Sequence, residues 1–327
     1  MSLFVSIPDS QAELIPATGH DGRRLHLYRL RSSRADAPVV MFGHACGFAA
    51  GSYLPLLKAL SRDAEVYAFD ARGHGGSEVP TPLGSGCTPE DYARDLASLS
   101  AVVAARGGKP VHYVGHSLNA AAMLHLGTCF PDLLRATPWR AMLLFEPPIF
   151  PSADRPEHAE CAEKDKRLVA RTRQRRESFA NPEELVSLLT GRGLFRDLSR
   201  DYLVAHAQAT LRPAAAGYTL ACPPAVEAAT FASFGEDSTF RALPGFPAEI
   251  PVHLVGGDPD GGPERNWTTL MAPALAERLG EKSTQRRFTQ LRGRGHLMVQ
   301  EDPDTILRLI GDLLQGIDFT AQESVHR

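Results

Sequence analysis

The sequence has few of the features that mark membrane, secreted or nucleic-acid-binding proteins. Its five cysteines are odd in number and form no Cys-x-x-Cys pair, which argues against a disulfide framework, zinc site or redox motif. No window reaches the roughly 18 apolar residues of a membrane span, and residues 1–10 lack a signal-peptide pattern. A formal charge of −3 gives no footprint for nucleic acid or an anionic membrane. We therefore expect a soluble, cytoplasmic protein that binds neither.

The chain is long and apolar enough for a substantial core. It has 327 residues, 43% of them hydrophobic, which suits one large domain or a domain with an insertion. Buried-strand and helix patterns alternate up to residue 148 and again from 250, as in a mostly parallel sheet flanked by helices. Residues 149–249 are instead helical, polar and interrupted by prolines. We predict an α/β core of residues 1–148 and 250–327, with 149–249 inserted as a helical lid.

One stretch joins a strand pattern to a helix pattern at a serine. The β-branched run from Val111 ends at Gly115-His116-Ser117, and an alanine-rich helix pattern begins at Leu118. This arrangement is typical of a nucleophile elbow, where the serine takes a strained backbone conformation between strand and helix. The strand should end at the carboxyl edge of the sheet, where open α/β sheets bind ligands. Ser117 is therefore the candidate nucleophile.

A histidine near the C-terminal end of the chain is the candidate general base. A serine hydroxyl is a poor nucleophile unless an imidazole accepts its proton, and the imidazole works best when a carboxylate fixes its tautomer. His296 follows the predicted strand 286–291 and comes after the serine and every candidate acid. His44, His74 and His116 compete for the role. We interpret His74 as part of a glycine-rich turn, and His116 should point away from its neighbour Ser117.

Three carboxylates that follow predicted strands could be the third member of the site. Asp258 and Asp260 lie on one loop, and Glu146 follows an earlier strand. Asp260 is preferred because Pro259 before it and Gly261-Gly262 after it suit a sharp turn that directs a side chain inward. Asp258 lies where its strand is only just ending. Glu146 and Asp258 therefore stay as the alternative acids.

Taken in register, these motifs resemble the α/β-hydrolase superfamily over about residues 39–316. The resemblance rests on five segments, which are His44-Ala45-Cys46-Gly47-Phe48, Phe69-Asp70-Ala71-Arg72-Gly73-His74-Gly75, Gly115-His116-Ser117-Leu118, Gly257-Asp258-Pro259-Asp260 and Gly295-His296. It implies the α/β-hydrolase fold, a triad of Ser117, His296 and Asp260, and an oxyanion hole formed by backbone NH groups of Leu118 and Cys46. A related branch takes its acid from the position of Glu146. No cofactor or metal is implied.

Two positions depart from the superfamily pattern. Asn119-Ala120 replaces the usual glycine pair after the nucleophile, and Ala45 replaces the glycine that normally follows the loop histidine. The first change predicts an elbow helix that lies slightly farther from its strand. Neither change removes a catalytic group, but both affect the shape of the oxyanion pocket.

The lid adds a second resemblance and a prediction about substrate. Segments 175–179 and 222–228 resemble the lid of a hydrolase subgroup that includes fungal toxin-biosynthesis hydrolases and a yeast peroxisomal lipase. Several apolar lid residues should either contact an apolar acyl chain or simply pack the lid onto the core. They are Leu188, Leu194, Phe195, Phe231 and Phe234.

The motifs together predict a serine hydrolase that cleaves a carboxylic ester, lactone or thioester through an acyl-enzyme intermediate. Its partner would be a small ester-like molecule with an apolar acyl part. A cofactor-free perhydrolase or a carbon–carbon bond hydrolase could use the same triad. From a different class, a ligand receptor could keep the triad with little turnover.

Overall fold

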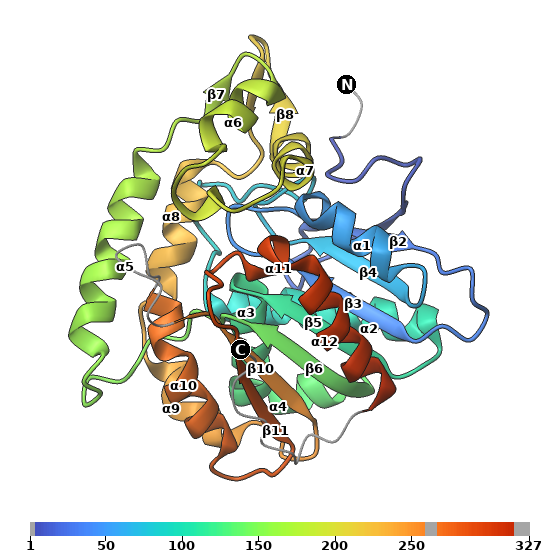
Figure 1. The fold of residues 1–327 in the computed structure, drawn as a ribbon, viewed down its shortest axis with the longest axis vertical. Helices are drawn as coiled ribbons and strands as arrows, with labels where there is room; N and C mark the ends of the chain where they lie inside the picture. Colours follow the sequence, from blue (N-terminus) through green and yellow to red (C-terminus); the bar gives the residue numbers. More distant parts are fainter. Residues whose placement is uncertain (1–3, 259–266, 317–327) are drawn as a thin grey trace.

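The computed structural model describes residues 4–258 and 267–316. Its centre is an eight-stranded sheet in the order β1-β2-β4-β3-β5-β6-β10-β11 (Figure 1). β2 runs antiparallel to β1 and β4, and every other neighbouring pair is parallel. The strands are β1 (Glu13–Thr18), β2 (Arg24–Leu30), β3 (Val39–Gly43), β4 (Glu65–Asp70), β5 (Val111–His116), β6 (Trp139–Phe145), β10 (Val252–Gly256) and β11 (Arg286–Gln290). The predicted α/β core with a mostly parallel sheet is confirmed.

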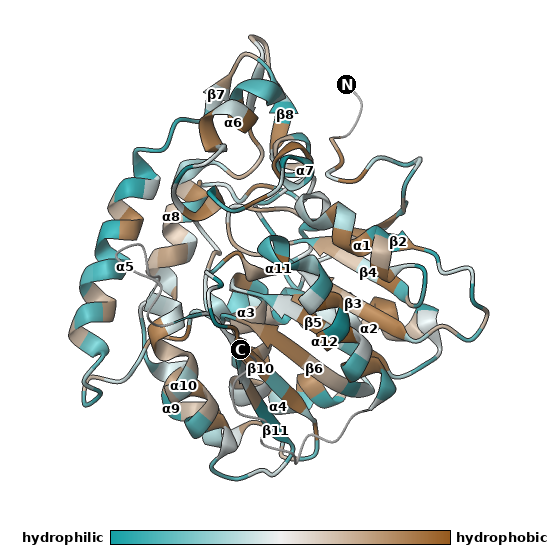
Figure 2. Cartoon of the chain, in the orientation of Figure 1, coloured by the Kyte–Doolittle hydropathy of each residue, from teal (hydrophilic) through white to brown (hydrophobic). Residues whose placement is uncertain are grey.

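Helices cover both faces of this sheet. Alternate strand residues face opposite sides, so Met41 of β3 belongs to the apolar cluster that includes α2, α3 and α10. Val40 and Phe42 belong to the second cluster, which includes α1 and α12. Figure 2 shows the apolar strands between the two helical layers. The core helices are η1 (Ala50–Tyr53), α1 (Leu54–Leu60), α2 (Pro89–Gly107), α3 (Leu118–Cys129), α4 (Pro131–Arg135), α10 (Trp267–Gly280), α11 (Met298–Glu301) and α12 (Pro303–Gln315). η3 (Leu243–Gly245) lies within the inserted segment but packs against α3 and α10.

Local sequence explains where the longest core helices begin and end. Thr88 and Asp91 form a reciprocal capping box at the start of α2, and Gly108 ends that helix in the left-handed conformation with φ +60°. Asp302 caps α12 by accepting the backbone N–H of Thr305 at 3.2 Å. Capping residues therefore set where these helices begin and end, and so set where the loops next to them begin and end.

Residues 149–249, which were predicted to form a lid and are called the lid below, are mostly helical but also contain strands. A small antiparallel sheet has the order β7-β9-β8. Its strands are only two or three residues long, which is too short to show an alternating pattern in the sequence. The lid elements are α5 (His158–Arg173), β7 (Ser178–Phe179), α6 (Pro182–Leu189), η2 (Gly193–Phe195), α7 (Arg200–Thr210), β8 (Leu211–Pro213), β9 (Tyr218–Leu220), α8 (Pro224–Ser233) and α9 (Ser238–Ala242).

Helix α8 of the lid is joined to the core by hydrogen bonds. The Thr230 hydroxyl lies 2.7 Å from the Tyr92 hydroxyl on α2. Farther along α8, the Ser233 hydroxyl donates to the carbonyl of Cys87 at 2.7 Å. This part of the lid is therefore bonded to α2 and to the loop between β4 and α2.

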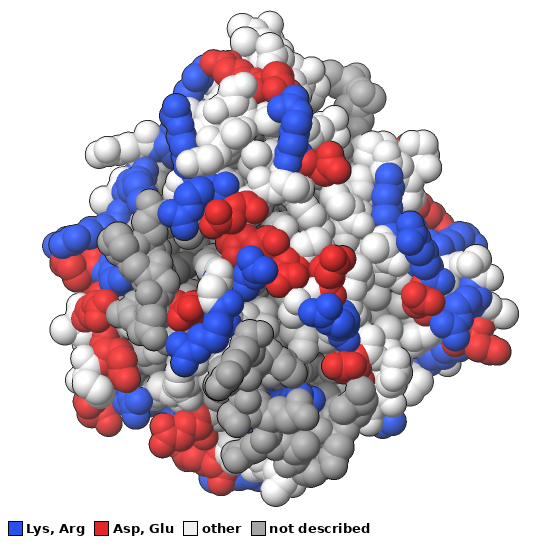
Figure 3. Space-filling view, viewed as in Figure 1, with Lys and Arg blue, Asp and Glu red and all other residues white. Residues whose placement is uncertain are grey.

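The surface carries charges of both signs. Figure 3 shows Lys/Arg and Asp/Glu side chains intermingled on one face of the molecule. The basic stretch around α5 forms ion pairs one helical turn apart, Lys164 with Glu160 and Arg167 with Glu163, as expected of a solvated helix face. Within residues 4–258 and 267–316, no helix has the length and apolar character needed to cross a membrane.

Candidate active site

Ser117 lies at a sharp turn between β5, which ends at His116, and α3, which begins at Leu118. Its φ of +51° and ψ of −115° are strained for a residue with a side chain. The Ser117 amide donates to the carbonyl of Phe145 at 2.8 Å, which ties the turn to β6. The strand–turn–helix geometry predicted from the sequence is present, and Ser117 is 5% exposed.

Glycines on two strands make room for Asn119 at the start of α3. A Cβ atom on Gly43 would lie 2.5 Å from the Cβ of Asn119, and one on Gly115 would lie 3.1 Å from the Cα of Ala120. These contacts leave little room for a methyl group, so the extra space expected between helix and strand is not seen. The Asn119 amide also donates to the carbonyl of His44 at 2.6 Å. Asn119 therefore ties the elbow to the loop after β3.

His296 lies between the serine and a carboxylate. Its Nε2 is 3.1 Å from the Oγ of Ser117, and its Nδ1 is 3.2 Å from Oε2 of Glu146. The ring is buried, with 8% of the residue exposed. Ser117, His296 and Glu146 thus lie in the same order of contacts as the serine, histidine and acid of a serine-hydrolase triad.

Glu146 ends β6 in a left-handed conformation, with φ +46°, and is fully buried. Its carboxylate accepts hydrogen bonds from the Gly257 amide at 2.6 Å and from the Thr268 and Thr269 hydroxyls at 2.7 and 2.8 Å. Burial alone would raise the pKa of Glu146, but the contact with His296 and these donors hold it below its ordinary value. The side chain is therefore an anion fixed beside the base.

Neither of the other two candidate acids is seen in contact with His296 in the part of the chain that the structure describes. Asp260, the preferred acid from the sequence, lies outside the described residues. Asp258 accepts the Gly293 amide at 2.7 Å, and the partner of His296 is Glu146. Which carboxylate reaches His296 depends on how far each strand extends at the sheet edge. The sequence does not show this, so residue spacing alone did not select Glu146.

The two residues expected to form the oxyanion hole are Leu118, directly after the serine, and Cys46, on the loop after β3. Leu118 is the first residue of α3, and the first amides of a helix have no intrahelical acceptor. Cys46 lies on the loop after β3, and burial raises the pKa of its thiol well above the ordinary value. A lid ion pair covers this loop, because a Cβ atom on Gly47 would lie 2.5 Å from Glu227, which binds Arg175 at 2.7 Å. The sequence analysis did not identify that pair as part of the site.

The competing histidines are engaged elsewhere. The imidazole of His44 accepts the backbone N–H of Ala71 at 2.9 Å, and Nδ1 of His74 lies 2.8 Å from the carbonyl of Arg72. His116 points away from its neighbour Ser117, as predicted, and hydrogen-bonds the carbonyl of His296. These side chains organise loops around the site.

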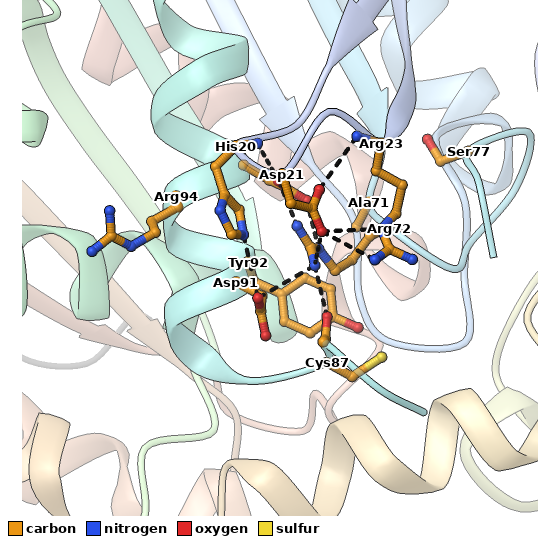
Figure 4. A network of polar contacts seen from close by, with 12 residues as sticks. His20, Asp21, Arg23, Ala71, Arg72, Ser77, Cys87, Asp91, Tyr92 and Arg94 are labelled. Atoms are coloured by element: carbon orange, nitrogen blue, oxygen red, sulfur yellow. Dashed lines mark hydrogen bonds and ion pairs between the residues drawn. The ribbon is translucent and has the colours of Figure 1, made fainter. Parts of the chain in front are cut away.

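The glycine-rich turn after β4 has a structural role centred on Arg72. Its guanidinium is fully buried, pairs with both oxygens of Asp95 at 2.7 Å and donates to the carbonyl of Gly86. It also lies 3.4 Å from the carboxylates of Asp21 and Asp91 (Figure 4). In the described part of the chain, His20, Asp21 and Asp95 form a cluster of metal-ligating groups. Because Asp95 already neutralises Arg72, we interpret this cluster as part of the ion-pair network.

The chain is similar in sequence to known hydrolases. A profile of the alpha/beta hydrolase family matches residues 39–309. Over 103 residues the chain is 34% identical to 2-(acetamidomethylene)succinate hydrolase of Mesorhizobium japonicum, covering 32% of this chain and 35% of that protein. The chain thus spans about a third of the length of the curated relatives it matches.

Solved structures share the fold over nearly the whole chain. E-2-(acetamidomethylene)succinate hydrolase superposes with a TM-score of 0.71 at 20% identity, covering 93% of this chain and 100% of the other. The enol-lactonase from Burkholderia xenovorans LB400 gives 0.61 at 18% identity, covering 92% and 100%. At these identities the likeness shows the fold alone.

Proposed function

The chain belongs to the alpha/beta hydrolase family, and from that premise we propose that it is a serine hydrolase that cleaves a carboxylic ester, lactone or thioester. Ser117 is the nucleophile, His296 the general base and Glu146 the acid. The observation that carries the proposal is the continuous contact from Ser117 Oγ through the imidazole to the Glu146 carboxylate, at 3.1 and 3.2 Å.

The proposed reaction has two halves. Nε2 of His296 accepts the hydroxyl proton while Ser117 Oγ bonds to the substrate carbonyl carbon. The tetrahedral intermediate then expels the alcohol or thiol, which takes that proton from the imidazolium. Water repeats the sequence on the acyl-enzyme, with His296 as base, and releases the carboxylic acid and the free serine. Glu146 stabilises the imidazolium in both halves and stays ionised.

Backbone amides supply the second part of the chemistry. We assign the oxyanion to the N–H groups of Leu118 and Cys46. Each donor aimed at the developing charge contributes roughly 3 kcal/mol to transition-state stabilisation. Neither assignment depends on the Cys46 thiol, which burial keeps neutral.

The lid supports an apolar acyl partner at one place. Phe195 of the lid stacks on Phe48 of the oxyanion loop, with ring centroids 5.8 Å apart and 4° between the planes. The pair would form an apolar wall beside the reacting carbonyl. By contrast, Leu188 and Leu194 are 38% and 37% exposed and do not favour this role. The acyl prediction therefore rests on Phe195.

The relatives narrow the class of substrate only broadly. One is named as a hydrolase of 2-(acetamidomethylene)succinate and the other as an enol-lactonase, and both proteins come from bacteria. We therefore keep esters, lactones and thioesters together as the substrate class, and a carbon–carbon bond hydrolase as the second candidate. The likeness of the lid to the fungal and yeast subgroup remains a hypothesis about the lid.

A labelling experiment tests the nucleophile and the class together. A fluorophosphonate probe should label the wild type once and should not label folded Ser117→Ala. The wild type is then given esters, lactones and thioesters of graded acyl length, with a vinylogous 1,3-diketone as the carbon–carbon substrate. Labelling that persists in Ser117→Ala would reject the nucleophile. A single round of acylation without further turnover would favour the receptor.

A further inference from the structure

A buried chain of hydrogen bonds links the oxyanion loop to the base. The Ala45 amide, one residue before Cys46, donates to the Tyr53 hydroxyl at 3.1 Å. That hydroxyl lies 2.7 Å from Nδ1 of His116, and Nε2 of His116 lies 2.8 Å from the carbonyl of His296.

The donors and acceptors in this chain have one consistent arrangement. The carbonyl of His296 can only accept, so Nε2 of His116 carries the proton that it donates there. Nδ1 of the neutral ring is then an acceptor, so the Tyr53 hydroxyl donates to it while accepting the Ala45 amide. Burial lowers the pKa of His116 well below its ordinary value, which keeps the ring neutral with this tautomer. Both Tyr53 and His116 are fully buried.

We propose that Tyr53 and His116 are positioning residues that hold the oxyanion loop and the His296 loop at a fixed separation during acyl transfer. The inference rests on the proposed serine-hydrolase function. Ser117 follows His116 directly, so the chain also passes through the elbow. The three loops come from the ends of β3, β5 and β11. The Asn119 amide already bonds the elbow to the β3 loop, and Ser117 contacts the imidazole of His296. The Tyr53–His116 chain adds a bonded path from the oxyanion loop to the backbone of the His296 loop.

Tyr53→Phe tests the chain with a matched control. Tyr28→Phe also removes a buried hydroxyl that accepts an amide, from Ser6, and donates to a buried acceptor, Asp70. Because misplacement by about 1 Å can cost on the order of 100-fold in rate, we expect Tyr53→Phe to lose about 10-fold to 100-fold in kcat. Its KM should change less than about twofold, since substrate binding precedes the misplaced step. Tyr28→Phe should lose stability only.

Two further readouts separate positioning from general stability. Affinity for a trifluoromethyl ketone, whose adduct with serine carries an oxyanion, should fall in Tyr53→Phe about as much as kcat. At His116, glutamine places its amide nitrogen near the Nε2 position, whereas asparagine reaches only the Nδ1 position. His116→Gln should therefore keep more activity than His116→Asn.

The outcomes distinguish this inference from the proposed function. A wild type that the fluorophosphonate does not label would reject the proposed function and the inference with it. If the wild type is labelled but Tyr53→Phe matches Tyr28→Phe in kcat, the inference alone fails. Equal activity of the two His116 variants, or a loss confined to KM, would also overturn it.

Discussion

The fold should lose stability steeply as the pH falls from 7 to 5, because it buries several histidines in the neutral form. Burial is the main cause of each depressed pKa. The values fall to about 3 for His44, His206 and His253 and to about 4 for His26 and His74. All five side chains have 5% or less of their surface exposed.

The magnitude follows from proton linkage. An unfolded histidine titrates near pH 6.5, so between pH 7 and 5 the unfolded chain binds protons that the fold does not. Each histidine then lowers the free energy of unfolding by about 2 kcal/mol, or about 10 kcal/mol for five. Burial raises the pKa of Asp70 and Asp165 to about 6, so the fold takes up protons there and regains about 1 kcal/mol at each. The net loss of about 8 kcal/mol is comparable with the whole stability of an ordinary domain.

Urea unfolding at pH 7, 6 and 5, followed by circular dichroism, measures this loss. His206→Gln should flatten the dependence by about 1.4 kcal/mol per pH unit between pH 6 and 5. Ser52→Ala is the control, because Ser52 hydrogen-bonds Nδ1 of His206 at 3.2 Å but is not ionisable. It should lower stability equally at each pH. A stability that stays constant from pH 7 to 5, or a wild-type slope in His206→Gln, would refute the reasoning.

Three further predictions concern single side chains. Glu146→Gln should lose on the order of 10⁴-fold in kcat in steady-state assays, while Asp258→Asn and Asp260→Asn stay near wild type. The opposite ranking would assign the role of the acid to Asp258 or Asp260. Thr268→Val removes a donor to the carboxylate and should lower kcat about tenfold with unchanged KM, whereas an unchanged kcat would leave that hydroxyl without a positioning role. Arg72→Met leaves a buried carboxylate unpaired and should cost about 3 kcal/mol or more in urea unfolding; unaltered stability would contradict a structural role for the arginine.

Local patterns selected Ser117 and His296, which the structure brings into contact, but did not select the carboxylate beside them. A strand, a turn and a helix lie within one short stretch around Ser117, and His296 follows the last strand directly. The choice of Glu146 depends instead on its backbone φ of +46° and on donors from a loop and helix more than 100 residues away. Those are tertiary properties that no local spacing reveals.

The same reasoning explains the missed elements of the fold. No strand was predicted at β1, an edge strand (Glu13–Thr18) that contains Pro16 and, among the described residues, pairs with β2. An edge strand tolerates proline and needs only one neighbour, so its pattern is weak. The lid strands are shorter still. The close approach of Asn119 to Gly43 could not be predicted from local patterns either, because the two residues are far apart in the chain.

The attachment of α8 affects how hydrolase chimeras could be built from this protein. Helix α8 lies within the inserted segment, but it is attached to the core. It hydrogen-bonds Tyr92 and Cys87, and its residue Glu227 lies against Gly47. A graft that exchanges residues 149–249 as one block would cut these bonds and expose the oxyanion loop. A crossover placed before Pro223 would instead transfer α5, α6 and α7 and leave α8 with its core partners Tyr92, Cys87 and Gly47, although it would exchange Arg175, which pairs with Glu227. Recombination between relatives should therefore succeed more often at that junction than at the end of the insertion.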